Sequence, residues 1–260
     1  LLGGLRADDM EYLRAQELYA AGISLYEERR AARSVPQDPR VGRLYAQYAD
    51  VDYFVTGDWD AALHNYRKAV AEQWDTPSVR YRTGWLYYER GDYAEALPQF
   101  VRAYSENNRD PVLLYALGNT LFRRGSWNAA RGYYERLMEM SEAERVRKGI
   151  LLPQVRADHG AFVEGYMHAA NNLGVTLYNL ADRTGETALR SRAYALFSES
   201  ARAWDALTRN PDTMVRAQGS NLAFLNMRAV TAPAGDFAPE IYTGLPKTLR
   251  GERVLRTRAD

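Results

Sequence analysis

The sequence of 260 residues contains no cysteine, which excludes disulfides and thiolate metal sites. It also lacks any window near the roughly 18 apolar residues that a helix needs to cross a bilayer, so we expect a soluble protein. Lysine is scarce and stands only at positions 68, 148 and 247. These absences leave the compartment open, and a bacterial cytoplasm or periplasm both fit.

The motifs of common enzymes are missing as well. There is no HExxH pair, no nucleophile elbow, and no GxxxxGK[ST] or GxGxxG loop for phosphate. Asp158 and His159 stand together in an irregular stretch and could form a base with its orienting group. A loop-capping aspartate beside a surface histidine is the simpler interpretation. We therefore predict a protein that is not an enzyme and needs no cofactor or metal.

What the sequence does contain is a repeat. Gly57, Gly91 and Gly125 recur every 34 residues, in the phrases GDWDAA, GDYAEA and GSWNAA. A fixed period of this length is typical of proteins built from stacked supersecondary units. With 46% hydrophobic residues and a net charge of +1, the composition is that of a globular chain.

Helix boundaries can be read from the residues around each repeat. A capping residue precedes proline at Asp38-Pro39, Thr76-Pro77, Asp110-Pro111 and Asn210-Pro211, which predicts four helix starts. The three glycines would end the first helix of each repeat, and Asp58, Asp92 and Ser126 would cap the second. Each repeat is thus predicted to be a helix–turn–helix.

The pattern resembles the tetratricopeptide repeat, a helical hairpin of 34 residues with small, aromatic and glycine positions at set places. In the first unit, 43–76, Asp50 replaces the small residue. The matching positions are Tyr53, Gly57, Trp59, Ala62, Tyr66 and Ala69 in that unit, Gly84, Tyr87, Gly91, Tyr93, Ala96, Phe100 and Ala103 in 77–110, and Gly118, Leu121, Gly125, Trp127, Ala130, Tyr134 and Leu137 in 111–144. The resemblance implies an all-α, right-handed α-solenoid of antiparallel helix pairs.

The remaining segments are predicted around these three regular repeats. One long helix covers 7–33, a short helix and a loop cover 141–160, and a divergent repeat covers 167–210, with a longer turn at 182–185. A capping helix at 212–230 would complete a solenoid over 1–230. Prolines and glycines in 231–260 predict an extended tail. Its basic residues could meet an anionic surface or belong to a solvated linker, and we expect no nucleic-acid partner.

One face of the first helices carries side chains at i, i+4 and i+7, which places each trio on one stripe. The trios are Gln47, Val51 and Phe54; Tyr81, Trp85 and Tyr88; Tyr115, Asn119 and Phe122; Asn171, Val175 and Tyr178. In the resembling family this face lines a concave groove for an extended peptide. Asparagine suits that role, since its carboxamide can donate a hydrogen bond to a peptide carbonyl and accept one from a peptide N–H. The lysines with which some members bind an acidic C-terminus are absent.

The binding residues predicted on this basis are Phe54, Tyr81, Trp85, Tyr88, Tyr115, Asn119, Phe122, Asn171 and Tyr178. The competing interpretation is that these side chains are core, since most aromatic stripes at helical spacing are buried. They could also lie under the chain's own tail, because the segment 237–249 contains Phe237, Ile241, Tyr242 and Leu245 and could act as an internal ligand.

The predicted function is an interaction scaffold that holds an extended segment or helix of a protein partner in an aromatic, near-neutral groove. A different class also fits, namely a structural module of a large bacterial cell-envelope or motility assembly. A third is the docking or regulatory portion of a multidomain protein. The sequence begins at Leu1 without methionine, which we interpret as a processed chain or a piece of a longer one.

Overall fold

The computed structural model of the chain describes residues 7–32, 36–152, 155–214, 221–231 and 237–244. All regular secondary structure within these ranges is helical, which confirms the prediction of an all-α fold. The helices form two compact units, which cover residues 1–106 and 107–260. The basic residues beyond position 244 lie outside the described ranges.

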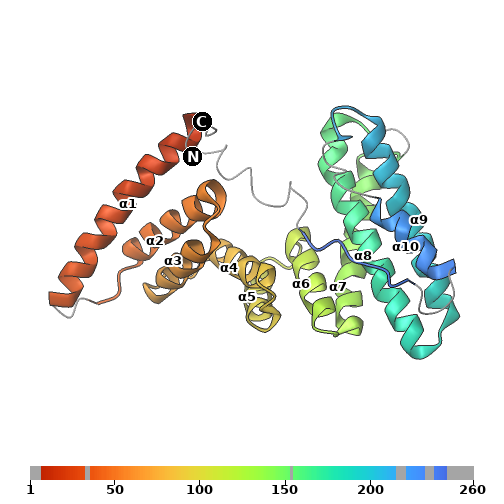
Figure 1. The fold of residues 1–260 in the computed structure, drawn as a ribbon, viewed down its shortest axis with the longest axis horizontal. Coiled ribbons are helices and arrows are strands. Elements are labelled where there is room, and N and C mark those ends of the chain that lie inside the picture. The colour runs from red at the N-terminus through yellow and green to blue at the C-terminus, as the bar shows by residue number, and fades with distance from the viewer. Residues whose placement is uncertain (1–6, 33–35, 153–154, 215–220, 232–236, 245–260) are drawn as a thin grey trace. The chain divides into compact units, whose positions relative to one another are not determined.

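The first unit consists of a long helix and two helical hairpins (Figure 1). Helix α1 (Ala7–Ala32) packs on α2 (Pro39–Val51), and a π-helical turn, η1 (Asp52–Thr56), extends the end of α2. Helix α3 (Trp59–Ala71) pairs with α2, and α4 (Pro77–Glu89) pairs with α5 (Tyr93–Glu106). The two hairpins contact each other through α3 and α4.

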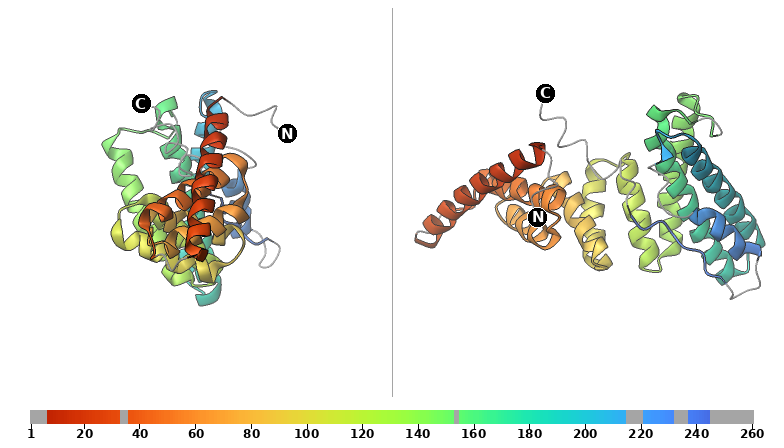
Figure 2. Two further views of the ribbon diagram at one scale, coloured as in Figure 1. Left: turned by 90° about the vertical axis from the view of Figure 1, so that its left-hand side faces the viewer. Right: turned by 45° about the horizontal axis from the view of Figure 1, so that its top comes forward.

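The second unit contains two further hairpins and a last short helix. Helix α6 (Pro111–Arg123) pairs with α7 (Trp127–Arg147), and α8 (Gly160–Thr184) pairs with α9 (Thr187–Arg209). A 3-10 turn, η2 (Ala157–His159), leads into α8. Helix α10 (Leu222–Thr231) packs on α9 and touches α8. Residues 237–244 follow as an extended segment (Figure 2).

Three of the four predicted helix starts are present. Asp38, Thr76 and Asp110 each occupy the N-cap, and their side chains accept a backbone N–H of the first turn while proline fills the first helical positions. Asp58 caps α3 in the same way. Ser126 occupies the N-cap of α7, but its side chain makes no capping hydrogen bond there.

The fourth predicted start, at Asn210-Pro211, is wrong. The Asn210 side chain accepts the Asp212 N–H at 2.9 Å, and residues 211–213 form a turn instead of an α-helix. Helix α10 begins only at Leu222, where Asn221 accepts the N–H of Phe224 at 3.0 Å. The capping helix is therefore shorter than the predicted 212–230, and residues 215–220 of that prediction lie outside the described ranges.

The hairpin turns depend on the three glycines that define the period. Gly57, Gly91 and Gly125 have φ of 72°, 81° and 72°, which is the left-handed region. A Cβ built on any of them would meet no atom within 4 Å. Backbone conformation therefore requires glycine here, and crowding does not.

At a second set of glycines, crowding by a neighbouring side chain is what excludes a larger residue. Cβ atoms on Gly84, Gly118 and Gly174 would lie 2.8, 2.5 and 2.6 Å from the aromatic ring that packs on each. These rings belong to the second helix of each hairpin and are wholly buried; they are Phe100, Tyr134 and Phe197. The ring thus occupies the space that a side chain on the first helix would need. This contact fixes how closely the paired helices approach.

The first hairpin replaces this contact with hydrogen bonds. Asp50 stands where the later hairpins have glycine, and the hydroxyl of the buried Tyr66 donates to its carboxylate at 2.6 Å. Arg82 of α4 forms an ion pair with the same carboxylate. Burial and the neighbouring Asp50 carboxylate keep the pKa of Tyr66 well above its usual range, so the hydroxyl remains a donor. The departure from the family pattern is therefore compensated locally.

The divergent repeat is a lengthened hairpin with a short turn. Eleven positions separate Gly174 from Gly185, against seven between Gly118 and Gly125, so α8 continues for one additional turn. Gly185 then ends it with φ of 75°, as the other turn glycines do. The longer turn predicted at 182–185 is wrong, because residues 182–184 belong to the helix.

The irregular stretch at 141–160 supplies part of the second unit's core. Helix α7 continues to Arg147, and the chain then turns at Gly149, whose φ is 62°. Ile150 and Val155 are buried against apolar side chains of α8 and α9, which are Val163, Tyr166, Met167, Ala203, Ala206 and Leu207. Asn210 donates to the Val155 carbonyl at 2.9 Å and holds the end of this stretch.

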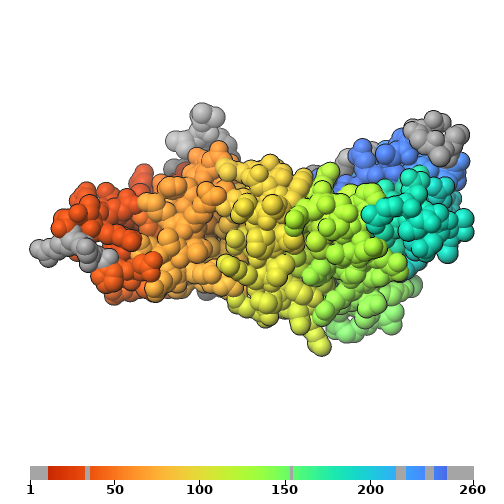
Figure 3. Space-filling view, turned by 90° about the horizontal axis from the view of Figure 1, so that it is seen from below, coloured from red at the N-terminus to blue at the C-terminus, as the bar shows by residue number. Residues whose placement is uncertain are grey.

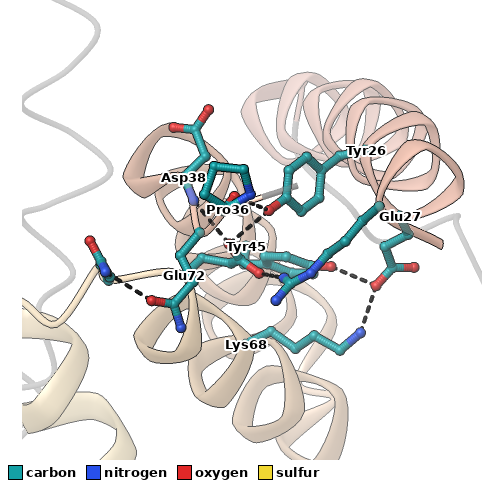
Figure 4. Close-up of polar contacts among 10 residues, drawn as sticks. Tyr26, Glu27, Pro36, Asp38, Tyr45, Lys68 and Glu72 are labelled. Carbon is teal, nitrogen blue, oxygen red and sulfur yellow. Dashed lines mark hydrogen bonds and ion pairs between the residues drawn. The ribbon is translucent and has the colours of Figure 1, made fainter. Parts of the chain in front are cut away.

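Helix α1 is attached to the first hairpin through a buried carboxylate (Figure 4). Glu72, which is 3% exposed, accepts the Tyr26 hydroxyl at 2.9 Å and the Asp38 N–H at 3.1 Å, and it pairs with Arg30. Beside it, Glu27 accepts from Tyr45 and Lys68, both at 2.6 Å. These groups satisfy the carboxylate that burial would otherwise penalise.

Two glycine-to-alanine substitutions in the second unit should have opposite effects. Gly118→Ala places a methyl group against Tyr134 and should lower the free energy of unfolding by about 1–3 kcal/mol. Gly132→Ala lies in α7, where a Cβ meets nothing within 4 Å, and should raise it by roughly 0.5–1 kcal/mol through helix propensity. Urea denaturation of both variants measures the difference, and equal effects would contradict the close-contact explanation.

Candidate functional site

The extended segment 237–244 lies across helices of the second unit. It runs back from α10 across α8 to α6, against the order of the helices (Figures 1 and 2). In the space-filling view of Figure 3, the blue residues, which include α10 and residues 237–244, lie against the green and teal residues of this unit. We call the surface beneath the segment the asparagine groove, defined by Tyr115, Asn119, His168, Asn171, Asn172 and Asn226.

Asn172 of α8 forms hydrogen bonds with both the N–H and the C=O of one residue in the segment. Its Nδ2 donates to the Tyr242 carbonyl at 2.9 Å, and its Oδ1 accepts the Tyr242 N–H at 2.7 Å. A carboxamide offers a donor and an acceptor side by side, which matches the N–H and C=O of an extended residue. The contact therefore recognises backbone and is independent of the side chain at position 242.

Asn226 of α10 repeats this arrangement two residues earlier. Its Nδ2 donates to the Glu240 carbonyl at 2.8 Å, and its Oδ1 accepts the Glu240 N–H at 2.9 Å. The Nδ2 of Asn171 also donates to the Glu240 carbonyl, at 3.0 Å. The Nδ2 of Asn226 donates in addition to the Oδ1 of Asn171, at 2.8 Å. The two carboxamides thus hold alternate residues, as the period of an extended chain requires.

Two side chains of α6 complete the contact with carbonyl groups. The Tyr115 hydroxyl lies 2.9 Å from the Tyr242 oxygen and 3.2 Å from that of Gly244. Asn119 donates to the Tyr242 oxygen at 3.2 Å, while its own Oδ1 accepts from Tyr134 and from Asn172. The ring of Tyr134, set in place by Gly118, therefore helps to orient Asn119.

Burial makes these polar contacts necessary. Asn119, Asn171, Asn172 and Asn226 are each 0% exposed. An amide in such a place costs about 1–3 kcal/mol if it loses its hydrogen-bond partner. The groove is therefore stable only when an extended backbone, or water, satisfies the carboxamides.

His168 of α8 supplies the aromatic part of the groove. Its ring stacks on that of Tyr242 with centroids 4.1 Å apart and an angle of 4° between the planes. Burial lowers the pKa of His168 to about 3, so the imidazole is neutral near pH 7. Burial also raises the pKa of Tyr242 to about 12. The groove thus presents no formal charge from these two rings.

Three of the predicted residues in the second unit lie in this groove, namely Tyr115, Asn119 and Asn171. Tyr178 does not contact the segment through a hydrogen bond; its hydroxyl donates to the Ala229 carbonyl of α10 at 3.3 Å and is part of the docking of that helix. Phe122 is half-buried, and its ring lies 6.4 Å from that of Trp127 at the end of the hairpin.

In the first unit, the predicted stripe packs largely on its own hairpin. Trp85 and Tyr88 are 3% and 4% exposed, and their rings stack at 4.9 Å. Trp85 and Tyr81 both approach Phe100 of α5, with centroids 6.3 and 6.1 Å away. Phe54 is half-buried beneath the guanidinium of Arg82. These four side chains contribute to packing in this structure.

Sequence reasoning missed His168, Asn172 and Asn226 as site residues. Asn172 is next to the predicted Asn171, and Asn226 stands inside the last helix. The usable signal was asparagine in mid-helix, where its propensity is poor and where burial demands a partner. His168 is three residues before Asn171 and so shares its face of α8.

Other candidate sites are weak within the described ranges. Asp158 is exposed and pairs with Arg156 at 3.2 Å, while His159 lies 4.0 Å from it. Among the described residues, no three acidic, histidine or cysteine side chains gather as a metal site would need. No helix in those ranges has the length and apolar character for a membrane crossing.

Together, the paired helices and their glycine contacts define a helical-repeat protein. Residues 87–148 match the family model described as the tetratricopeptide repeat. This match confirms the resemblance predicted from the 34-residue period, and the chain carries tetratricopeptide repeats there. A solved structure described as YrrB, a TPR protein with an unusual peptide-binding site, is similar at 18% identity and a TM-score of 0.49, covering 75% of this chain and 86% of that one. No curated protein matches.

Hydrogen exchange should reveal the two carboxamide contacts. The N–H groups of Glu240 and Tyr242 should exchange slowly, and Asn172→Ala should accelerate exchange at Tyr242 by roughly 5- to 150-fold, corresponding to about 1–3 kcal/mol. Asn128→Ala, an exposed asparagine on α7, is the matched control and should change neither. Rapid exchange at both positions in the unaltered chain would contradict this description of the groove.

The free energy of unfolding of the chain should fall in acid because of His168. Its pKa in the folded protein lies below the unfolded value near 6.5, so the stabilisation is complete above about pH 6.5 and declines as the pH falls toward 3. Between pH 7 and pH 5 the loss should be about 2 kcal/mol. Urea denaturation at pH 7 and at pH 5 measures it. His168→Phe should remove most of this dependence, and an unchanged pH profile would contradict the assignment.

Proposed function

We propose that this chain is a non-enzymatic interaction scaffold whose asparagine groove holds an extended segment of a protein partner. Tetratricopeptide repeats suggest a protein-interaction scaffold in general. The more specific proposal places the contact in the second unit, on Tyr115, Asn119, Asn171, Asn172 and Asn226.

The proposal rests on the paired backbone hydrogen bonds that Asn172 and Asn226 each make to one residue of the segment. Each carboxamide engages both the N–H and the C=O of one residue, and the residues engaged are two apart. Such contacts fit any extended polypeptide, because every residue except proline offers the same two groups. A partner segment could therefore take the place that residues 240–244 occupy.

The chain's own segment sets the condition under which a partner binds. A covalently linked ligand competes at an effective concentration in the millimolar range for a short linker. A partner must then either bind more tightly than the segment or arrive when the segment is displaced. Capture by the unaltered chain should therefore be weaker than capture by a variant whose segment has been weakened.

The structural-module alternative has one observation in its favour. With the groove filled by residues 240–244, contacts with a larger assembly would use other surfaces. Helix α1 carries Leu18 and Leu25 at 74% and 50% exposure, seven residues apart and therefore on one face of that helix. Such a module would retain its partner when the groove is altered.

A peptide-display selection tests the proposed function. The bait is the full chain carrying Tyr242→Ala, which removes the ring that stacks on His168 and weakens the internal segment. We expect it to select peptides, and the same bait with Asn172→Ala and Asn226→Ala should lose them by tenfold or more.

The control for this selection is Asn128→Ala in the same bait, which alters an exposed asparagine of α7 and should leave binding unchanged. Peptides that bind the bait equally with and without the groove asparagines would place the contact elsewhere and refute the proposed groove.

A further inference from the structure

The internal segment also indicates which side chains the groove accepts. Two adjacent residues of the segment, Ile241 and Tyr242, lie against the protein, and the residues on either side of them are exposed. Glu240 and Thr243 are exposed, so the groove places little restriction on which side chains stand at those two positions. Between them, Ile241 is 6% exposed and the ring of Tyr242 lies flat on His168. Selectivity is therefore concentrated on two adjacent positions.

The position of Ile241 favours an aliphatic side chain. Its backbone stands between two residues whose N–H and C=O groups are held by Asn226 and Asn172. Because both neighbours are fixed, the side chain at 241 is directed into the protein and cannot rotate away by a local change of the strand. A charged group there would be buried without compensation, and this is strongly unfavourable.

The position of Tyr242 favours a flat ring. The imidazole of His168 is parallel to it at 4.1 Å, and the Tyr242 ring also packs against the core cluster formed by Ile150, Val155 and helices α8 and α9. Stacked aromatic pairs contribute beyond the area that they bury. An aliphatic side chain could fill part of the space but would lose the stacking on His168.

We propose that the partner segment carries an aliphatic residue followed directly by an aromatic one, in an extended stretch that replaces Ile241 and Tyr242. This inference rests on the proposed function, because it assigns sequence selectivity to the same groove. The partner's aliphatic side chain takes the buried position between the two carboxamides. Its aromatic ring stacks on His168. The internal segment and the partner are thus alternative occupants of one site.

A peptide with the sequence of residues 237–244, FAPEIYTG, provides the probe. Its affinity is measured by fluorescence anisotropy for the full chain carrying Ile241→Asp and Tyr242→Ala, which disables the internal competitor. We expect binding at least tenfold tighter than to the unaltered chain. Replacing tyrosine by phenylalanine in the peptide should preserve affinity, and replacing it by alanine should reduce affinity at least tenfold.

The peptide FAPEYITG is the decisive control, because it has the same composition and exchanges only the two selective residues. It should bind at least tenfold more weakly. Equal affinity for FAPEIYTG and FAPEYITG would overturn the selectivity while leaving a backbone-reading groove intact. The selectivity would also be overturned if display selected groove-dependent peptides that lack an aliphatic–aromatic pair. A bait that selects no groove-dependent peptides would instead remove the proposed function itself.

A second measurement keeps the test valid if the double variant does not fold. In the unaltered chain, a saturating amount of FAPEIYTG should accelerate exchange of the Tyr242 N–H at least tenfold, because the displaced segment loses Asn172, while FAPEYITG should not. No acceleration by either peptide would overturn the competition. A concentration-dependent dimer that Tyr242→Ala abolishes would assign the groove to the segment of a second copy, and would likewise overturn the proposal.

Discussion

The packing of an aromatic ring over a helix glycine is the contact on which the repeats depend. Phe100, Tyr134 and Phe197 each occupy the space that a Cβ would need on the paired helix, and all three rings are wholly buried. The distance between the two helices of a hairpin follows from this contact. In the first hairpin, Asp50 and the Tyr66 hydroxyl reach the same end by a hydrogen bond.

The same contact also builds the groove. Once Gly118 has admitted the ring of Tyr134, the hydroxyl of that tyrosine reaches the Asn119 carboxamide oxygen. That bond leaves the amide of Asn119 directed at the Tyr242 carbonyl. Architecture and recognition therefore share one side chain, and a change at Gly118 should disturb both.

The repeated part of the fold was predictable because its signals are local. The left-handed turns at Gly57, Gly91 and Gly125 and the caps at Asp38, Thr76 and Asp110 each depend on neighbouring residues alone. The start of α10 was not predictable in this way, since the capping pattern at Asn210-Pro211 leads into a turn and α10 begins at Leu222. The burial of Ile150 and Val155 likewise requires α8 and α9 to be in place.

The candidate site was predicted in part for the same reason. Helical spacing placed Tyr115, Asn119 and Asn171 on one face, and the structure brings these three together. The same spacing selected Trp85 and Tyr88, which are buried, because a period of 3.6 cannot distinguish a face that packs from one that stays open. Asn226 was out of reach, since its contact with Glu240 joins two segments whose pairing no local pattern encodes.

The spacing of Asn226 and Asn172 has a consequence for register. The two carboxamides hold residues two apart, so sliding an extended occupant by two positions would restore every backbone contact of both asparagines. A shift of one would place each side chain on the opposite face. Backbone contacts therefore fix only whether odd-numbered or even-numbered residues present their N–H and C=O groups to the two asparagines. The absolute position of the chain depends on the two side chains that lie against the protein, the buried Ile241 and the ring of Tyr242 on His168.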